Sequence, residues 1–255
     1  MKYINLGINN EYDFIKVINK LKFKNMDFNI QEFLLDIYDN KIYQNDLFYS
    51  WKNLSNQKTD IYIRKNSDKD YKCISIKMGS NNSIHTEKLD TFIKFLKKNK
   101  INDYYIKILI KYHYKDNSMD GSGKIRFPAK EYKNLHYDNI CILNDKFRNE
   151  DLLFNLIKRF ILIGKNDNDV VDVVVHGTPN NFLYIKSKDL YKMLKIHMND
   201  INNSVHFSFF VYQNKNANLN FNPRFERDRK YIQIKWYNIV DIIIENMNNM
   251  INSNN

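Results

Sequence analysis

Glycine, proline and cysteine are scarce in this chain of 255 residues, which contains 6 Gly, 3 Pro and 2 Cys. It has no glycine-rich loop to cradle a phosphate, and neither the Gly-x-Ser-x-Gly nor the His-Glu-x-x-His pattern occurs. Cys73 and Cys141 stand alone within strand-like runs, so they offer neither a disulfide framework nor a Cys-x-x-Cys metal site. Two isolated cysteines favour a reducing, intracellular setting.

Long apolar runs are also missing. No stretch approaches the roughly 18 to 20 apolar residues that a membrane span requires. The segment 152–163 comes nearest, but Asn155, Lys158 and Arg159 interrupt it. The first residues lead into no apolar stretch, so we expect no signal peptide. These features predict a soluble, cytoplasmic protein without a membrane partner.

Positive charge and aromatic residues are plentiful. The chain carries 40 Lys and Arg against 29 Asp and Glu, a net charge of +11, together with 17 Phe and 18 Tyr. A hydrophobic content of 43% predicts a folded protein with a substantial core. A basic chain with aromatics among its lysines indicates a polyanionic partner, with nucleic acid as the first candidate. The alternative is that the many lysines only reflect an A/T-rich coding genome.

Helix-like and strand-like patterns are mixed along the chain. Without strict alternation of strands and helices, they predict a mixed α/β fold, a central mixed sheet flanked by helices. The helices are expected at residues 10–21, 29–40, 84–98, 150–162, 188–197 and 237–250. The strands are expected at residues 61–64, 73–78, 104–114, 140–143, 169–175, 206–212 and 230–236, with 43–57 as a connector.

A polar turn at residues 65–72 joins two alternating strands into a predicted β-hairpin. A symmetric antiparallel register sets Asp60 opposite Lys77 and Tyr62 opposite Ser75. The isoleucines of both strands then share one face, and the acid, the hydroxyl and the lysine share the other. A slip of one residue would break that sorting.

An acid beside a lysine suits the hydrolysis of a phosphodiester bond. With a second oxygen ligand, Asp60 can hold Mg²⁺, which lowers the pKa of a bound water. Lys77 can orient that water and stabilise the charge that develops on the phosphate. The run from Asn82 to Glu87 follows the lysine strand directly, and it is denser in polar groups than a simple turn requires.

Asp60, followed on the next strand by Ser75-Ile76-Lys77, resembles the signature of the restriction-endonuclease-like nuclease superfamily, which is Asp and then Asp/Glu-x-Lys. The resemblance covers roughly residues 29–114, with a helix before the hairpin and a helix and a strand after it. It implies a restriction-endonuclease-like core with additional C-terminal strands and helices. It also implies that Asp60 binds Mg²⁺, or Mn²⁺ in its place, and that Lys77 is the catalytic lysine.

The chain departs from this signature at Ser75, where the superfamily usually has a second carboxylate. A serine hydroxyl is a poorer ligand for Mg²⁺. Some members take the acid from the following helix or from an upstream helix, and Glu87 and Glu32 are the residues here that match those places. The remaining polar groups of the predicted site are Asn82, Ser83 and His85, of which His85 and Ser75 are also catalytic candidates.

Each of these residues also has a purely structural explanation. Asp60 and Lys77 can form an exposed cross-strand pair, and Glu87 is favoured in a first helical turn by the helix dipole alone. Glu32 can be a solvated helix residue and His85 a packed histidine. The alternative function is therefore a non-catalytic nucleic-acid-binding module that has lost the second acid.

The second half of the chain contains a basic segment and a rival acid-and-lysine pair. The rival is Asp172 with Gln233-Ile234-Lys235, although no tight hairpin links the two. His176-Gly177-Thr178-Pro179 is either a recognition loop or a strand exit. The basic segment is either a charged turn or a surface for phosphates and base edges. The nucleic-acid-binding candidates are Arg224, Arg227, Arg229, Lys230 and Lys235.

These patterns together predict a Mg²⁺-dependent DNA endonuclease. We expect residues 1–115 to form the nuclease core and residues 125–255 to grip DNA and dimerise, either as two domains or as one continuous domain. Cutting both strands with one site per chain favours a two-fold pair, so a homodimer on double-stranded DNA is expected. A type II restriction enzyme is the first candidate, and a repair or phage-defence nuclease is the second.

Overall fold

The chain divides into two compact units, each assembled from separate segments of the sequence. The computed structural model describes residues 6–55, 57–79, 83–163, 169–201, 203–215 and 219–253. Unit 1 comprises residues 1–82, 157–193 and 238–255, and unit 2 comprises residues 83–156 and 194–237. The boundaries therefore do not follow the expected division between residues 115 and 125.

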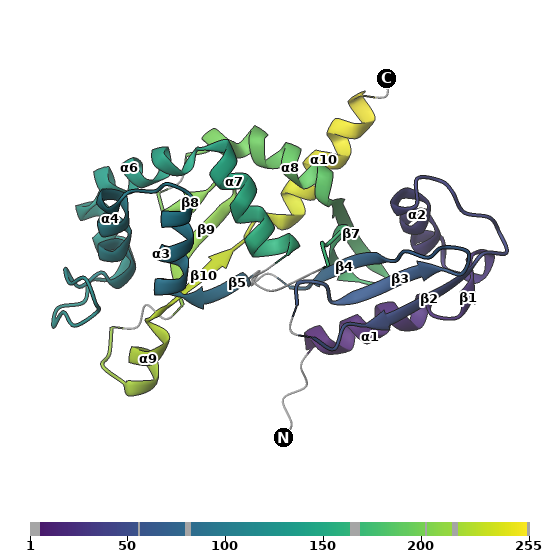
Figure 1. The fold of residues 1–255 in the computed structure, drawn as a ribbon, viewed down its shortest axis with the longest axis horizontal. Coiled ribbons are helices and arrows are strands. Elements are labelled where there is room, and N and C mark those ends of the chain that lie inside the picture. Colours follow the sequence, from purple (N-terminus) through teal and green to yellow (C-terminus); the bar gives the residue numbers. More distant parts are fainter. Residues whose placement is uncertain are drawn as a thin grey trace. The chain divides into compact units, whose positions relative to one another are not determined.

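Unit 1 is built on a mixed six-stranded sheet in the order β1-β2-β3-β4-β6-β7 (Figure 1). Its neighbouring strands are antiparallel except β4 and β6, which run parallel. The mixed α/β class expected from the sequence is confirmed. The strands are β1 (Leu21–Lys22), β2 (Leu47–Lys52), β3 (Ile61–Lys65), β4 (Lys72–Lys77), β6 (Val173–Thr178) and β7 (Asn181–Lys186).

A hydrophobic core of unit 1 lies on one face of this sheet. Helix α1 (Leu6–Ile18) packs along it and buries Phe14 and Ile18, and α2 (Phe28–Ile37) adds a second apolar stripe (Figure 1). Alternation along β3 and β4 directs their isoleucines into this core and their polar residues to the opposite face. The buried isoleucines are Ile61, Ile63, Ile74 and Ile76.

Unit 1 also contains the 3₁₀ turn η1 (Phe23–Asn25), the π-helical turn η2 (Lys158–Leu162) and the C-terminal helix α10 (Ile239–Ser253). The unit boundaries fall within α7 (Glu150–Ile157) and α8 (Ser187–Ile196), which is followed by η3 (His197–Asn199). Within the described residues, no helix combines the length and the apolar character that crossing a membrane requires.

Unit 2 contains a four-stranded antiparallel sheet in the order β5-β10-β9-β8. Its core contains Phe92, Phe207 and Trp236. The strands are β5 (Ser83–Lys88), β8 (His206–Phe207), β9 (Phe210–Asn214) and β10 (Tyr231–Lys235). The helices are α3 (Leu89–Lys98), α4 (Asp103–Tyr114), α5 (Ala129–Leu135), α6 (Tyr137–Phe147) and α9 (Pro223–Asp228).

Several secondary-structure predictions are wrong. Residues 104–114 and 140–143 were expected to be strands, but they belong to helices α4 and α6. The residues before Leu89, expected to begin a helix, form strand β5, because they pair with the distant β10. The expected connector at residues 43–57 contains strand β2, which pairs with both β1 and β3.

Candidate active site

Three donors of strand β4 converge on one carboxylate oxygen, Oδ2 of Asp60. The Ser75 hydroxyl donates to it at 3.1 Å, the backbone N–H of Ile76 at 2.6 Å and the Lys77 ammonium group at 3.4 Å. The side chains of Lys77 and Asp60 are 23% and 22% exposed, so the ion pair is accessible but only partly solvated. The acid, the hydroxyl and the lysine of the predicted hairpin therefore meet at a single atom.

The register that produces this arrangement is shifted by two residues from the predicted one. Tyr62 pairs with Cys73 rather than with Ser75, so the predicted opposition of Asp60 and Lys77 is wrong. Side chains alternate between the faces with a period of two, and a shift of two residues therefore keeps each side chain on its face. Lys77 reaches Asp60 diagonally instead of straight across.

Strand β6 brings a histidine to the same face. His176 is aligned with Lys77 in the parallel pairing of β4 with β6, and its Nε2 lies 3.2 Å from the carbonyl oxygen of Gly79. Sequence reasoning treated His176 as part of a loop or strand exit, whereas it lies inside β6. Only the pairing of two strands far apart in the chain would have placed His176 beside Lys77, and one sequence does not contain that information.

Glu87 and His85 lie on strand β5, not at the start of a helix as expected. Oε1 of Glu87 is 3.1 Å from Nε2 of His85, and the two side chains are 0% and 6% exposed. Both residues belong to unit 2, whereas Asp60 and Lys77 belong to unit 1. Their predicted roles as a metal ligand and a catalytic group therefore stay predictions.

Glu32 does not fit the role of second acid. It is exposed on α2, near Tyr184 of β7. Burial raises the pKa of the Tyr184 hydroxyl, and the charges of Asp36 and Glu32 raise it further. Tyr184 packs against the core on the helix-covered face of the sheet, whereas Asp60 lies on the opposite face.

Of the two predicted supporting polar residues, Ser83 and Asn82, the structure describes only Ser83. Ser83 accepts a hydrogen bond from the side-chain amide of Gln233 at 2.8 Å, within the β5–β10 pair. Asn82 lies outside the described residues.

Asp60 suits a metal that takes most of its ligands from elsewhere. Among the described residues its three donors all bond Oδ2, which leaves Oδ1 for a cation. Proteins often hold Mg²⁺ through one or two carboxylates, with several waters and the oxygens of a substrate phosphate. In the described part of the chain, no three His, Cys, Asp or Glu side chains gather as a metal site. A metal here would therefore need water and substrate to complete its shell.

The rival pair in the second half is not supported as a site. The Asp172 carboxylate accepts the backbone N–H of Cys73 at 2.7 Å in unit 1, and burial raises the pKa of Asp172. Lys235 lies on β10 of unit 2, where burial lowers the pKa of its amine. The Asp172 carboxylate is therefore already engaged in a hydrogen bond that ties the residue before β6 to strand β4.

The basic segment at residues 224–230 contains both buried and exposed cations. Arg229 is 3% exposed, and its guanidinium group lies 3.1 Å from the Asp116 carboxylate and donates to the carbonyl oxygen of Tyr114 at 2.7 Å. It thereby anchors the loop that follows α4. Buried positions do not suit direct contact with a phosphate, so the structure does not favour this role for Arg229 or for the buried Lys235.

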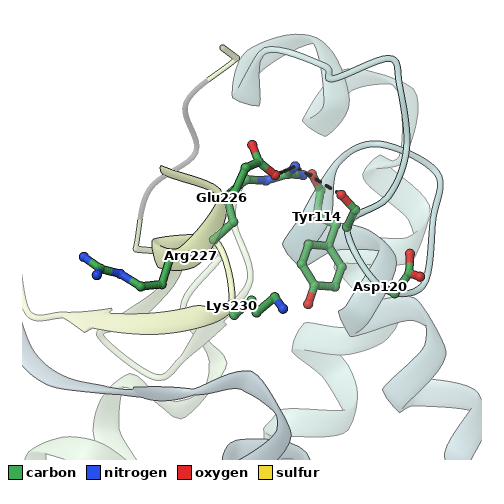
Figure 2. A pocket seen from close by; sticks show the side chains of 7 residues that line it. Tyr114, Asp120, Glu226, Arg227 and Lys230 are labelled. Carbon is green, nitrogen blue, oxygen red and sulfur yellow. Dashed lines mark hydrogen bonds and ion pairs between the residues drawn. The ribbon is translucent and has the colours of Figure 1, made fainter. Parts of the chain in front are cut away.

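The exposed cations of this segment are Arg224, Arg227 and Lys230. Two of them line a pocket of about 360 Å³ in unit 2 (Figure 2). In Figure 2, Lys230 and Tyr114 point toward each other across the pocket, and Arg227 extends away from it. The other lining residues are Asp120, Gly121, Glu226 and Arg229.

The comparisons with known proteins include a similarity of chain path to a solved structure. No protein-family model matches the sequence. A search of curated proteins gives no match either. Among solved structures, the chain is similar to restriction endonuclease MspI in complex with its cognate DNA, at 15% sequence identity and a TM-score of 0.46, over 81% of this chain and 77% of that chain. A similarity of this size assigns neither an activity nor a site residue to this chain.

Proposed function

We propose that this protein is a Mg²⁺-dependent endonuclease that hydrolyses phosphodiester bonds of DNA at Asp60 and Lys77. The observation that carries the proposal is the convergence of Ser75, Ile76 and Lys77 on Oδ2 of Asp60. It places a lysine beside a carboxylate whose Oδ1 accepts no hydrogen bond from the described residues, at a partly exposed position on the polar face. An acid and a cation at this spacing suit the binding of a phosphate and the activation of water.

Each residue has a defined task in this proposal. Hydrolysis adds a water oxygen to phosphorus, breaks one P–O ester bond and delivers a proton to the leaving oxygen. Lys77 would orient the water and stabilise the negative charge on the phosphate. Asp60 would hold Mg²⁺, which supplies a Lewis acid and lowers the pKa of bound water. Ser75 and the Ile76 N–H would keep the Asp60 carboxylate in place.

The remaining features support a DNA partner. The net charge of +11 and the exposed cations of the segment at residues 224–230 favour a polyanion. Double-stranded DNA cut on both strands would call for two copies of a single site, so the proposal includes a homodimer. Among DNA endonucleases, a type II restriction enzyme is the first candidate for the biological role of this protein.

A second function is favoured by one specific observation. Ser75 stands where a second carboxylate is expected, and no three potential ligands gather in the described part of the chain. A chain that keeps Asp60 and Lys77 only as a cross-strand ion pair would bind nucleic acid without cutting it.

Cleavage of plasmid DNA by Lys77→Ala and Asp60→Ala variants separates these functions. We expect each substitution to reduce cleavage with Mg²⁺ by roughly 10²–10³-fold, because it removes a group that stabilises the transition state. Binding of the same DNA should be retained, since neither residue belongs to the proposed DNA grip. Lys72→Ala is the matched control, because Lys72 lies on the same strand but contacts Tyr38 of the helix-covered core.

Cleavage that survives in both variants would contradict the proposed site. Wild-type protein that binds DNA but cuts none, across varied sequences and with either Mg²⁺ or Mn²⁺, would favour the binding module. Loss of cleavage in Lys72→Ala to the same extent would show that the effect lies in the fold and not in the ion pair.

A further inference from the structure

A cluster of three aromatic rings lies beside the Asp60 site, on the same face of the unit 1 sheet. Trp51 pairs with Tyr62 across β2 and β3, and their rings stack with centroids 5.5 Å apart and planes at 29°. Tyr71, just before β4, meets Tyr62 edge-on at 4.8 Å and Trp51 edge-on at 6.0 Å. We call Trp51, Tyr62 and Tyr71 the ring cluster.

One carboxylate holds two of these rings in place. The Tyr62 hydroxyl donates to Oδ2 of Asp169 at 2.7 Å, and the Tyr71 hydroxyl donates to Oδ1 at 3.1 Å. Burial and the bond to Asp169 raise the pKa of the Tyr62 hydroxyl, and the bond to Asp169 raises that of Tyr71. Both rings are therefore neutral and fixed in orientation before any ligand arrives.

The ring cluster is fixed and yet open to solvent. Trp51 is 38% exposed and Tyr71 is 41% exposed, whereas the other tryptophan of the chain, Trp236, is 0% exposed. The Arg64 guanidinium carbon lies 6.0 Å from the Trp51 ring centroid. Aromatic faces with a cation beside them are the features with which proteins bind unstacked bases and the adjoining phosphates.

The ring cluster lies close enough to the candidate active site for neighbouring nucleotides of one DNA strand to contact both. Tyr62 follows Asp60 by two positions on the same face, which is a separation of about 6.6 Å along the strand. A strand whose phosphate meets Lys77 would therefore bring a neighbouring base to the rings. A base stacked inside an intact duplex has no free face to offer them.

We propose that the ring cluster stacks against an unstacked nucleobase next to the scissile phosphate. This inference rests on the proposed function and narrows its substrate class to nucleic acid with an unstacked nucleotide at the cleavage point. Such a base comes either from single-stranded DNA or from a duplex that has one base extruded. The rings serve both sources in the same way, because every base presents an aromatic face.

Binding to three labelled DNAs tests the inference on the full-length protein without divalent metal. The probes are a deoxythymidine decamer, a fully paired duplex, and the same duplex with one unpaired base. Trp51→Ala should weaken binding of the decamer, of the duplex with the unpaired base, or of both by about tenfold or more. Binding of the fully paired duplex should weaken less than twofold. Trp51→Phe should retain the affinity, because it keeps a flat aromatic face. Tyr43→Ala, at an exposed tyrosine outside the ring cluster, is the matched control.

The probes also distinguish the two sources. A loss confined to the decamer identifies single-stranded DNA, and a loss confined to the duplex with the unpaired base identifies an extruded base. Tryptophan fluorescence is an independent measurement, since Trp236 is buried and Trp51 is exposed. Binding of the decamer or of the duplex with the unpaired base should quench the tryptophan fluorescence of the wild type. Binding of the fully paired duplex should leave that fluorescence unchanged.

Equal effects of Trp51→Ala on all three DNAs, or no effect on any, would overturn the inference. Its failure is distinct from failure of the proposed function. If Lys77→Ala abolishes cleavage while Trp51→Ala changes no affinity, the nuclease stands without the stacking site. If Trp51→Ala selectively weakens binding of unstacked DNA while the wild type cuts nothing, the ring cluster is a binding surface of a non-catalytic protein.

Discussion

At the scale of single residues, a buried histidine links the stability of unit 2 to pH. Nδ1 of His113 lies 2.7 Å from the Tyr212 hydroxyl, and Nε2 lies 2.6 Å from the Arg229 carbonyl oxygen. A carbonyl only accepts, so Nε2 carries the proton and Nδ1 accepts from the tyrosine hydroxyl. Burial lowers the pKa of His113 from 6.5 to about 4. The stabilisation is therefore complete above pH 6.5 and is lost as the pH falls toward 4, because the unfolded chain binds the proton first.

We expect this residue to account for a fall of on the order of 3 kcal/mol in the free energy of unfolding between neutral pH and pH 4. Urea titrations of the wild type and of His113→Gln at each pH measure it. The variant should be less stable at neutral pH and should lose less stability on acidification. His136→Gln, at a half-buried histidine, controls for the loss of an imidazole. Parallel stability curves for wild type and His113→Gln would contradict the assignment.

At the scale of elements, helix α4 is held at its start by one side chain. The Asn102 side-chain oxygen accepts the backbone N–H groups of Tyr104 at 3.1 Å and Tyr105 at 3.4 Å. Asn102→Ala leaves these donors without that acceptor, so we expect a loss of about 1 kcal/mol in the free energy of unfolding. Asn102→Asp keeps the acceptor and should stay close to the wild type. Equal stability of Asn102→Ala and the wild type in urea titrations would show that the cap contributes nothing.

The same helix shows where sequence reasoning failed. Alternating isoleucines favoured a strand, but Ile106, Leu109 and Tyr112 are buried at helical spacing, while Ile108 and Ile110 are half-buried. A stretch with apolar residues on several sides fits both the two-residue period of a strand and the 3.6-residue period of a helix. Asn102 at the start of the segment was the signal that distinguishes them, because such caps precede helices.

The hairpin of the candidate site shows what a pattern can predict. Alternation placed Asp60, Ser75 and Lys77 on one face correctly, since a face depends only on whether positions are odd or even. The register was off by two residues because hydrophobic alternation is unchanged by such a shift. His176 beside Lys77 and the pairing of β5 with β10 depend on contacts between distant segments, which local patterns do not encode.

At the scale of the whole molecule, the chain order hides the division into units. Residues 157–193 and 238–255 return to unit 1 after the chain has entered unit 2. The loop at residues 116–124 separates the two expected parts, 1–115 and 125–255, but it lies within unit 2, where the Asp116–Arg229 ion pair holds it. The expected division between residues 115 and 125 therefore does not coincide with the boundaries of the compact units.

The positive charge of the molecule leads to a prediction about salt. If Arg224, Arg227 and Lys230 contact phosphates, each releases counterions on binding, and affinity falls as salt rises. Replacing all three by alanine should reduce the slope of log affinity against log salt by about 3, roughly one for each cation removed. Anisotropy of a labelled duplex between about 50 and 200 mM salt measures this slope.

The matched control removes the same charge from another part of unit 2. Lys98, Lys107 and Lys111 are exposed on helices α3 and α4, and replacing them by alanine lowers the net charge equally. If α9 and the residues after it contact the DNA, only the first set changes the slope by about 3, because distant charges are screened within about 10 Å at 0.1 M salt. Equal slopes for the two triple variants would mean that the attraction comes from net charge alone and that the segment at residues 224–230 is no specific contact surface.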